Sequence, residues 1–255
     1  MIVYTYWVDL PGHDKPAYLE LCRKSWLNNT PNLEVITINH KNIYEFIPKK
    51  ILPPIFFKFS LAMQSDIVSA WVLTMFGGLF IDSDTIITRN INDMPFGKTD
   101  KLTAFGYPSL KSVHLAVLSA NKRNKLTAAW FAEILKRLKN PSGGISWDYV
   151  GNGILDPLIQ SGDFDEQFHI VDATEAGNIL EFSQPEKEPW ERYWSYYFMP
   201  DATRDFSSEL AKCKCGIISL HNSWTPANFK LLSENAIKNM KNDFLLPYIL
   251  IEANS

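Results

Sequence analysis

The stretch SDIVSAWVLTMFGGLFIDSDT, residues 65–85, combines a long apolar run with a glycine pair and two carboxylates. The apolar pattern predicts a buried helix over 59–76, with Ser60 as its N-cap and Gly77 as its C-terminal stop. The run GLFID, residues 78–82, is typical of a buried strand. This stretch therefore predicts a helix, a glycine turn and a strand that ends in a carboxylate.

Helix and strand patterns alternate along the rest of the chain, without repeats or low-complexity segments. Such alternation favours an α/β sandwich around a mostly parallel sheet, in which ligands bind at the carboxyl ends of the strands. We expect further strands over 2–8, 33–38, 102–108, 113–120 and 215–224, helices over 17–29 and 125–140, a short helix within 41–54, and an irregular region over 143–162.

The composition is that of a globular protein. The chain has 255 residues, 46% of them hydrophobic, and a net charge of −3. This length fits a single domain over 1–255, and the charge balance gives no electrostatic indication of nucleic acid as a partner. The aromatic content of 13%, with eight Trp, suits sugars and bases but equally suits an ordinary core.

The three cysteines, Cys22, Cys213 and Cys215, predict inert thiols in a reducing compartment. No secretory signal is expected at the N-terminus. The uncharged run over 67–81 is too short to span a bilayer. The apolar run FLLPYILI, residues 244–251, fits either the core or a peripheral contact with a membrane surface.

Asp82 and Asp84 lie at the end of the strand that is predicted within residues 65–85. In an extended chain, residues two apart point to the same face, whereas Ser83 between them points away. Two carboxylates held close repel each other unless a proton or a cation lies between them. Oxygen ligands of this kind suit Mg²⁺ or Mn²⁺, which also take substrate phosphates. A solvated turn is the alternative interpretation of the same pattern.

The string LFIDSDT also matches the nucleophile motif of haloacid-dehalogenase-like phosphatases. In that interpretation Asp82 attacks phosphorus and Asp84 is the general acid. That family carries its motif near the start of the domain and needs a later acidic cluster for Mg²⁺. The candidate cluster here, within 161–168, follows no clear apolar strand. The phosphatase therefore stays an alternative.

Residues 65–84 resemble the signature of the DXD-containing sugar transferases, which are the family 32 glycosyltransferases and the related bacterial capsular polysaccharide synthesis proteins. The shared pattern is Ser-Asp, an apolar helix, Gly-Gly and then Asp-x-Asp. The resemblance extends to YTYWVD (4–9), to LNNTPNLEVITINHKNIYEFIP (27–48) and to HNSW (221–224). It hardly covers the middle of the chain. The arginine of the family's Ser-Asp-x-x-Arg string is replaced here by Ser69.

The resemblance implies a role for individual residues. Trp7 would stack on uracil and Asn42 would help to hold the base, although Asn42 also fits a plain helix N-cap. Asp66 would hydrogen-bond the donor sugar, and Asp82 would meet ribose and metal. The nucleotide-sugar site would comprise Trp7, Asn42, Ser65, Asp66, Asp82, Ser83, Asn222, Ser223 and Trp224, and the metal ligands would be Asp82, Asp84 and His221.

The resemblance also implies a GT-A fold, of the Rossmann-like nucleotide-sugar-binding type, and a retaining glycosyltransferase. It divides the chain into a donor part over 1–110 and an acceptor part with a C-terminal lid over 111–255. The donor would be a UDP-sugar, the cofactor Mn²⁺ or Mg²⁺, and the acceptor a glycan or lipid-linked glycan of a bacterial surface polysaccharide, handled in the cytoplasm or at the inner face of the membrane. No catalytic nucleophile is assigned. Because Ser69 removes a cation, a non-catalytic sugar-nucleotide-binding protein is a further alternative.

Overall fold

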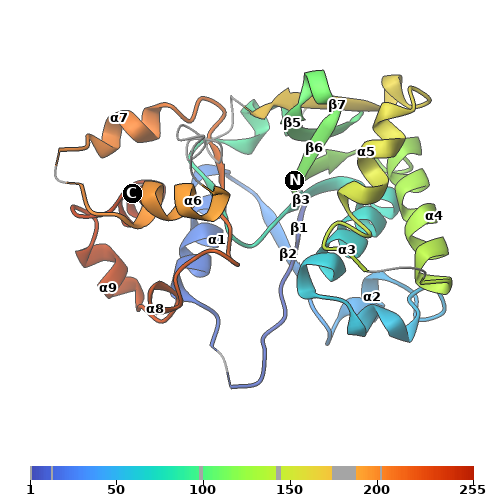
Figure 1. The fold of residues 1–255 in the computed structure, drawn as a ribbon, viewed down its shortest axis with the longest axis horizontal. Coiled ribbons are helices and arrows are strands. Elements are labelled where there is room, and N and C mark those ends of the chain that lie inside the picture. The colour runs from blue at the N-terminus through green and yellow to red at the C-terminus, as the bar shows by residue number, and fades with distance from the viewer. Residues whose placement is uncertain (1, 13, 98–99, 142–144, 174–187, 202) are drawn as a thin grey trace. The chain divides into compact units, whose positions relative to one another are not determined.

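The computed structural model describes residues 2–12, 14–97, 100–141, 145–173, 188–201 and 203–255 (Figure 1). These residues form two compact units, each assembled from separate stretches of the chain. Unit 1 contains the described residues of Met1–Val8, Glu34–Asp82 and Pro95–Asp172. Unit 2 contains those of Asp9–Leu33, Ser83–Met94 and Ala173–Ser255. The division of the chain near residue 110 into donor and acceptor parts stays a prediction.

The described part of unit 1 is built on a six-stranded sheet with the order β2-β1-β3-β6-β5-β7. The pairs β1–β2, β1–β3 and β5–β7 are parallel, and β6 is antiparallel to both of its neighbours. All strands except β6 therefore run in one direction, which confirms the predicted α/β fold around a mostly parallel sheet. The strands are β1 (Ile2–Tyr6), β2 (Glu34–Ile38), β3 (Gly78–Ile81), β5 (Leu102–Tyr107), β6 (Ser112–Ala120) and β7 (Phe168–Asp172).

Helices α3 and α4 pack against each other in unit 1, with the rings of Trp71 and Phe131 4.9 Å apart. The predicted N-cap of α3 is confirmed, because Ser60 Oγ accepts a hydrogen bond from the Met63 amide. Most of α3 is buried, as its apolar sequence predicts. The helices of unit 1 are α2 (Ile43–Phe46), α3 (Leu61–Met75), α4 (Lys125–Lys139) and α5 (Asn152–Gln160).

Gly77 and Gly78 make the turn from α3 to β3. Both have positive φ angles, of 70° and 101°, which an L-residue with a side chain rarely adopts. A Cβ on Gly77 would lie 2.5 Å from the backbone nitrogen of Lys122. The glycine pair is therefore required by both conformation and space, and it carries the chain directly into the strand that precedes Asp82.

Unit 2 contains a two-stranded antiparallel sheet of β4 (Thr85–Ile87) and β8 (Ile217–Ser219). Helix α1 (Ala17–Asn29) lies against β4, and Trp26 Nε1 donates a 2.6 Å hydrogen bond to the Thr85 carbonyl. The remaining helices are α6 (Pro189–Phe198), α7 (Phe206–Ala211), α8 (Ala227–Lys230), α9 (Glu234–Asn239) and α10 (Leu245–Glu252). Short 3₁₀ helices occur in both units, as η1 (Pro54–Lys58), η2 (Ile91–Asp93), η3 (Pro95–Gly97), η4 (Pro108–Leu110) and η5 (Asp165–Gln167).

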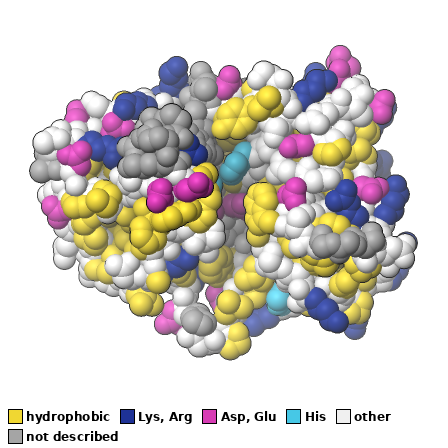
Figure 2. Space-filling model, in the orientation of Figure 1, with side chains coloured by type: hydrophobic (Ala, Val, Ile, Leu, Met, Phe, Trp, Pro, Cys, Tyr) yellow, Lys and Arg dark blue, Asp and Glu magenta, His cyan; other side chains and the backbone are white. Residues whose placement is uncertain are grey.

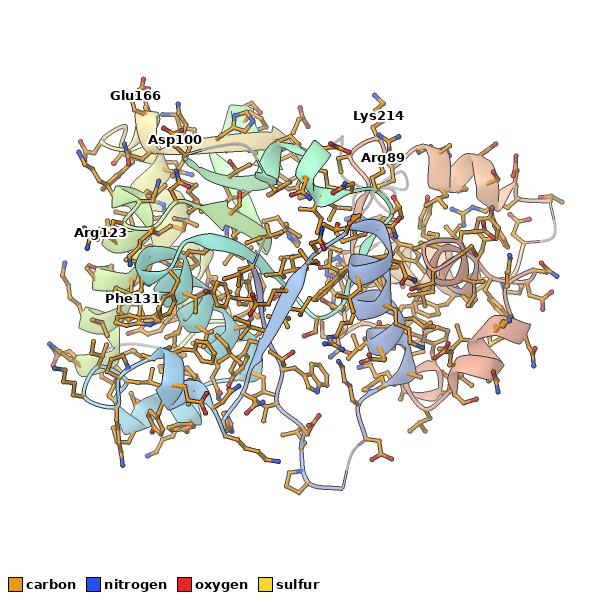
Figure 3. All side chains as sticks on the ribbon, turned by 180° about the vertical axis from the view of Figure 1, so that it is seen from behind. Arg89, Asp100, Arg123, Phe131, Glu166 and Lys214 are labelled. Carbon is orange, nitrogen blue, oxygen red and sulfur yellow. The ribbon has the colours of Figure 1, made fainter. Side chains whose placement is uncertain are left out.

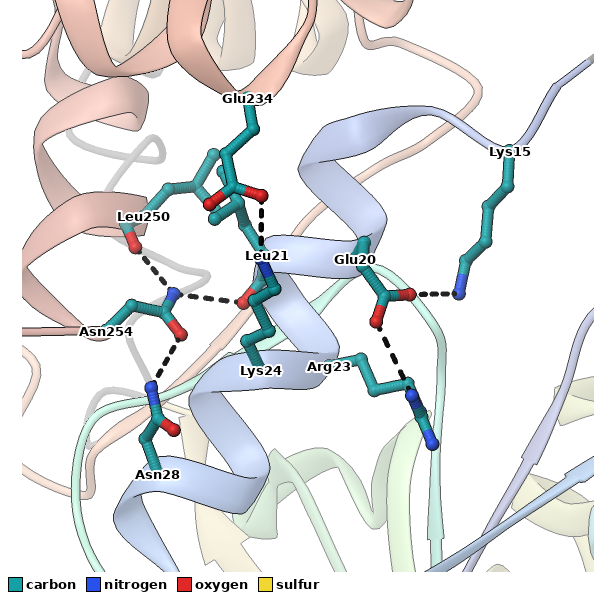
Figure 4. Close-up of polar contacts among 9 residues, drawn as sticks. All are labelled: Lys15, Glu20, Leu21, Arg23, Lys24, Asn28, Glu234, Leu250 and Asn254. Carbon is teal, nitrogen blue, oxygen red and sulfur yellow. Dashed lines mark hydrogen bonds and ion pairs between the residues drawn. The ribbon is translucent and has the colours of Figure 1, made fainter.

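Polar contacts join α1 to the C-terminal helices of unit 2 (Figure 4). Asn254 Nδ2 donates to the carbonyl oxygens of Leu21, at 3.0 Å, and Leu250, at 2.8 Å. The Lys24 ammonium forms a 2.6 Å ion pair with Glu234. The partly buried bonds of Asn254 contribute more to this packing than the exposed ion pair, because water screens the latter.

A second contact fixes the approach to β8. Arg89 Nη1 donates a 2.8 Å hydrogen bond to the Lys214 carbonyl, and both residues lie together in Figure 3. Gly216, with φ of 78°, follows, and a Cβ at this position would lie 2.9 Å from the side chain of Arg89. The arginine therefore packs on the turn that leads into β8.

Two expectations from the sequence need correction. The region over 143–162 is not wholly irregular, because α5 forms there despite Pro157 within it. Helix α5 buries Ile154, Leu155 and Ile159, which offsets the missing backbone donor of the proline. The expected strand over 215–224 is limited to β8, and the four residues HNSW leave it as a turn.

The apolar run over 244–251 belongs to the core. It forms most of α10, where Leu245, Leu246, Ile249 and Leu250 are fully buried. Of the two interpretations of this run, the structure supports packing inside unit 2. Within the described residues, no helix combines the length and apolar composition that crossing a bilayer requires.

Candidate functional site

Trp7 and Asn42 lie where β1 and β2 end in unit 1. Trp7 is only partly buried, unlike the core residues before it, and its amide donates to the Ile38 carbonyl at 3.0 Å. The Asn42 amide group closes the loop after β2: Oδ1 accepts from the Asn39 amide at 2.8 Å and Nδ2 donates to the Thr37 carbonyl at 2.9 Å. Asn42 precedes α2 but makes no side-chain capping bond to it. Its role at the base stays a prediction.

The structure brings Ser65 and Asp82 together. Ser65 Oγ, on α3, donates a 3.2 Å hydrogen bond to Asp82 Oδ1, directly after β3. The Asp82 amide continues the ladder of the sheet by donating to the Ala116 carbonyl at 2.8 Å. The backbone of Asp82 is therefore fixed by the sheet, and its side chain is oriented by the helix that precedes the strand.

The environment of the Asp66 carboxylate disfavours its charged form. Its Oδ2 packs so closely on Gly151, which precedes α5, that a Cβ there would lie 2.6 Å from this oxygen. Burial raises the pKa of Asp66 to about 8. Among the described residues, none donates a hydrogen bond to this carboxylate. The Asp66 side chain is only partly buried, but a carboxylate that loses hydration without gaining a hydrogen-bond donor costs stability, and such groups are typical of functional sites.

Ser69 explains part of this environment. It is fully buried, and its Oγ donates to the Asp66 carbonyl at 2.9 Å, one helical turn earlier. Residues three apart on a helix share a face, so an arginine at position 69 would be a neighbour of the Asp66 side chain. The serine supplies no charge, and the Asp66 carboxylate is left without that cation.

In unit 2, the structure brings Asp84 to the predicted HNSW element, although 138 residues separate Asp84 from Asn222. The Asn222 amide donates to Asp84 Oδ2 at 2.7 Å, and the Leu220 amide donates to the Asp84 carbonyl at 3.0 Å. Burial raises the pKa of Asp84, while the Asn222 amide and the charge of His221 act in the opposite direction. The Asn222 amide thus holds the Asp84 carboxylate in a partly desolvated position, and the Leu220 amide holds the Asp84 backbone.

The HNSW element is a compact turn with an aromatic wall. The rings of His221 and Trp224 are 4.2 Å apart, and Tyr193 of α6 lies 5.3 Å from the His221 ring. Tyr18 of α1 donates to Asn222 Oδ1 at 2.5 Å. The side chain of Ser223 is exposed. Sequence reasoning missed Tyr18 and Tyr193, because neither lies in a motif and both reach this turn only through folding.

Lys230 is a further residue that the sequence did not single out. Burial lowers the pKa of Lys230, and the charge of Asp84 opposes this shift. Lys230 also lines a cavity of about 360 Å³ within unit 2, together with Gly12, Asp14, Lys15, Ala17, Leu231, Leu232 and Ser233. The wall of this cavity therefore carries two ammonium groups and one carboxylate.

The boundary between the two units falls within the Asp-x-Asp motif. Asp82 belongs to unit 1, and Ser83 and Asp84 belong to unit 2. In the part of the chain that the structure describes, no group of three or more His, Cys, Asp or Glu side chains forms a ready-made metal site. Mg²⁺ and Mn²⁺ do not require one, since they bind through one or two carboxylates, water and substrate phosphates. A desolvated carboxylate such as that of Asp84 fits a cation of this kind.

If Trp7 stacks on uracil, as the resemblance implies, Trp7→Ala is expected to weaken UDP binding by roughly 5- to 150-fold, because an aromatic–base stack contributes about 1–3 kcal/mol. Trp7→Phe should lose less affinity for UDP than Trp7→Ala. Calorimetric titration with UDP measures both effects. Circular dichroism checks folding, and a Trp7→Ala variant that unfolds, or one that binds UDP like the wild type, would contradict the stacking role.

Comparison with known proteins gives one family match. The family model described as "Capsular polysaccharide synthesis protein" matches residues 1–134. No curated protein sequence matches the chain.

Several solved glycosyltransferase structures are similar in part. GlyE of Streptococcus pneumoniae TIGR4 has a TM-score of 0.49 and 14% identity, over 99% of this chain and 59% of that one. An active-site variant of LgtC has a TM-score of 0.46 and 11% identity, over 90% of this chain and 93% of that one. Mouse xyloside xylosyltransferase 1 has a TM-score of 0.40 and 12% identity, over 88% and 98%.

The family match confirms one expectation drawn from the sequence, the resemblance to capsular polysaccharide synthesis proteins. The matched residues include the first strand, the Ser65-Asp66 dipeptide and the Asp-x-Asp pair. They make up more than half of the 255 residues. The chain therefore belongs to the capsular polysaccharide synthesis protein family.

Proposed function

We propose that this protein is a metal-dependent glycosyltransferase. It transfers a sugar from a UDP-sugar to a glycan or lipid-linked glycan acceptor, with retention of anomeric configuration, during synthesis of a bacterial surface polysaccharide at the cytoplasmic side of the membrane. The family match supports a role in polysaccharide synthesis. The donor, the cation and the stereochemistry follow from the resemblance of the Asp-x-Asp and HNSW motifs.

One observation carries the proposal. The Asn222 amide donates to Asp84 Oδ2, so two motifs that lie far apart in sequence meet in unit 2. The resemblance assigns both motifs to the same metal and diphosphate. A phosphatase needs the Asp-x-Asp motif but has no use for a His-Asn-Ser-Trp turn at its second carboxylate. The contact therefore favours the transferase over the phosphatase.

Asp84, Asp82 and His221 are the proposed ligands of Mn²⁺ or Mg²⁺. When bound, such a cation neutralises the charge that develops on the departing diphosphate. The backbone bond from Asn222 orients the Asp84 carboxylate, and the packing of His221 on Trp224 restrains the imidazole ring. Both contacts reduce the entropy that these side chains lose when they take up a ligand.

The HNSW turn would act as a lid on the diphosphate. Trp224 presents a large apolar ring that excludes water, and Ser223 and Asn222 offer donor groups. Donors aimed at the leaving phosphate stabilise the transition state more than the ground state. Burial lowers the pKa of Lys230 and the charge of Asp84 opposes this shift, so the lysine would add a cation to the same region of unit 2.

Trp224→Ala tests this lid. We expect it to lower turnover far more than it weakens UDP binding, because the ring is needed chiefly when charge develops. The matched control is Trp190→Ala, which removes an exposed tryptophan of α6 in the same unit. Turnover from initial rates and affinity from UDP titration are compared. Equal loss of both would indicate a simple binding wall, and loss of neither would exclude the lid.

The proposal as a whole is tested by incubating the protein with a panel of UDP-sugars and Mn²⁺ and measuring UDP release. Nuclear magnetic resonance of the released or transferred sugar reports the anomeric configuration. We expect release with one donor or a few, and retention. Binding of UDP without release would identify a non-catalytic sugar-nucleotide-binding protein, and a phospho-aspartate at Asp82 would identify a phosphatase.

A further inference from the structure

Unit 1 carries a further surface whose exposed side chains have no role in the proposed site. It is formed by the loop after β2, by α2 and by η1, and we call it the basic-aromatic surface. Figure 2 shows basic and hydrophobic side chains side by side over the region where Figure 1 draws α2. Its members are exposed: Lys41, Tyr44, Lys49, Lys50, Phe57 and Lys58.

The charge of this surface is opposite to that of the chain. Residues 40–58 contain four lysines and one acid, Glu45, whereas the whole protein has a net charge of −3. Among the described residues, none of these four ammonium groups forms an ion pair with a carboxylate. Elsewhere many lysines do, as Lys101 does with Glu166. The charges of the basic-aromatic surface are therefore available to an external anion.

Aromatic side chains lie between these lysines. Tyr44 is 42% and Phe57 38% exposed, and their ring centroids are 6.3 Å apart. The Lys49 ammonium lies 5.8 Å from the centre of the Tyr44 ring. Phe57 also contacts the His40 ring, at 5.1 Å. These contacts show an ordered arrangement of rings and cations rather than isolated surface residues.

The core holds this segment in place. Phe56, next to Phe57, is completely buried, and Trp71 Nε1 of α3 donates a 2.8 Å hydrogen bond to the Phe46 carbonyl at the end of α2. Buried anchors on both elements fix the backbone that carries the exposed rings and lysines. The surface is therefore formed before any partner binds, and little entropy is lost on binding.

The lysines around α4 provide a contrast within the same unit. Lys122, Lys125, Lys136 and Lys139 are also exposed, but residues 121–140 contain no exposed large hydrophobic side chain. Positive charge alone is therefore not specific to the basic-aromatic surface. The combination of unpaired lysines with exposed rings is what distinguishes it.

We infer that the basic-aromatic surface binds the surface of a bilayer that contains anionic lipids. Lysine ammonium groups are attracted by anionic headgroups, and aromatic rings favour the interface between headgroups and acyl chains. An acidic soluble partner would use the lysines but would leave the two rings without a matching apolar environment. The inference does not depend on the proposed glycosyltransferase activity.

The experiment is sedimentation of the full chain with vesicles of phosphatidylcholine alone or of equal parts phosphatidylcholine and phosphatidylglycerol. We expect binding to the anionic vesicles only, weakened by added salt. Replacing Lys41, Lys49, Lys50 and Lys58 together by Gln should lower the partition coefficient by roughly 100- to 1000-fold, because each lysine near an anionic surface contributes about 1 kcal/mol. Tyr44→Ser with Phe57→Ser should lower it less, and circular dichroism checks both variants.

A matched control removes the same charge from the same unit: Lys122, Lys125, Lys136 and Lys139 replaced together by Gln. We expect the partition coefficient of this variant to fall by less than 10-fold, which is about the effect of long-range charge alone. Equal loss in the two four-lysine variants would overturn the inference, as would absence of binding to anionic vesicles. Binding to a soluble acidic polysaccharide but not to vesicles would assign the surface to a glycan instead.

Discussion

Asp84→Asn is expected to lower sugar transfer by about 1000-fold and to remove the dependence on Mn²⁺. The reason is that a bound metal ion stabilises the charge of such a transition state by several kcal/mol. The substitution keeps the shape of the side chain and an oxygen that can accept the Asn222 amide bond. Only the negative charge is lost. Initial rates of UDP release over a Mn²⁺ titration give both quantities.

The control for Asp84→Asn is Asp93→Asn, which makes the same chemical change at an exposed position of unit 2. Its rate and Mn²⁺ dependence should equal those of the wild type. An Asp84→Asn variant that still transfers sugar in a Mn²⁺-dependent way would contradict the assignment of Asp84 as the principal metal ligand.

Asp66→Asn is expected to change stability and activity in opposite directions. The partly buried carboxylate has no hydrogen-bond donor among the described residues, and an amide removes its charge. We expect a gain of roughly 1–2 kcal/mol in the free energy of unfolding, or about 4 °C in Tm, at neutral to alkaline pH. Transfer measured above pH 8, where Asp66 is ionised, should fall by roughly 10- to 100-fold, since a charged acceptor for a sugar hydroxyl is lost.

The pH dependence of this gain has a defined sign. The pKa of Asp66 is about 8 in the folded protein and about 3.9 in an unfolded chain. Between these values the folded state holds a proton that the unfolded state has lost, so the contribution of Asp66 to stability falls as pH rises. Thermal unfolding at several pH values should therefore show the wild type losing Tm relative to Asp66→Asn up to about pH 8.

Two variants support the interpretation of Asp66. Asp163→Asn, at an exposed position of unit 1, should leave the pH profile unchanged. Gly151→Ala should lower both stability and transfer, because the new Cβ would lie 2.6 Å from Asp66 Oδ2 and 2.8 Å from Leu115 Cδ1. An Asp66→Asn variant whose Tm follows the wild type at every pH would show that burial of Asp66 has no energetic cost.

Elements with strong local signals could be predicted from the sequence. Helix α3 has a capping serine before it and a glycine turn after it, and α4 has a clear apolar face, so both appear within one or two residues of the predicted bounds. Helix α5 could not be predicted, because the hydrogen bonds that hold it come from a strand that is distant in sequence. Asn152 and Asp156 bond to β6, including a 2.6 Å bond from Asn152 Nδ2 to the Val113 carbonyl.

The candidate site was only partly predictable for the same reason. Ser65 and Asp82 lie 17 residues apart in one helix–turn–strand unit, so their contact follows from local structure. The contact of Tyr18 with Asn222 joins residues 204 apart, and no periodicity indicates it. The resemblance alone suggested that Asp84 and HNSW act together. The packing of Asp66 on Gly151 had no signal in the sequence beyond the presence of a glycine.

We propose above all that Asp84 and the HNSW turn bind uridine diphosphate through a divalent cation. Calorimetric titration of the wild-type protein with UDP, with and without Mn²⁺, tests it most directly. We predict saturable binding of one UDP per chain that is at least about 10-fold tighter with Mn²⁺ than without it. Failure to bind UDP in either condition, or equal binding in both, would contradict the claim.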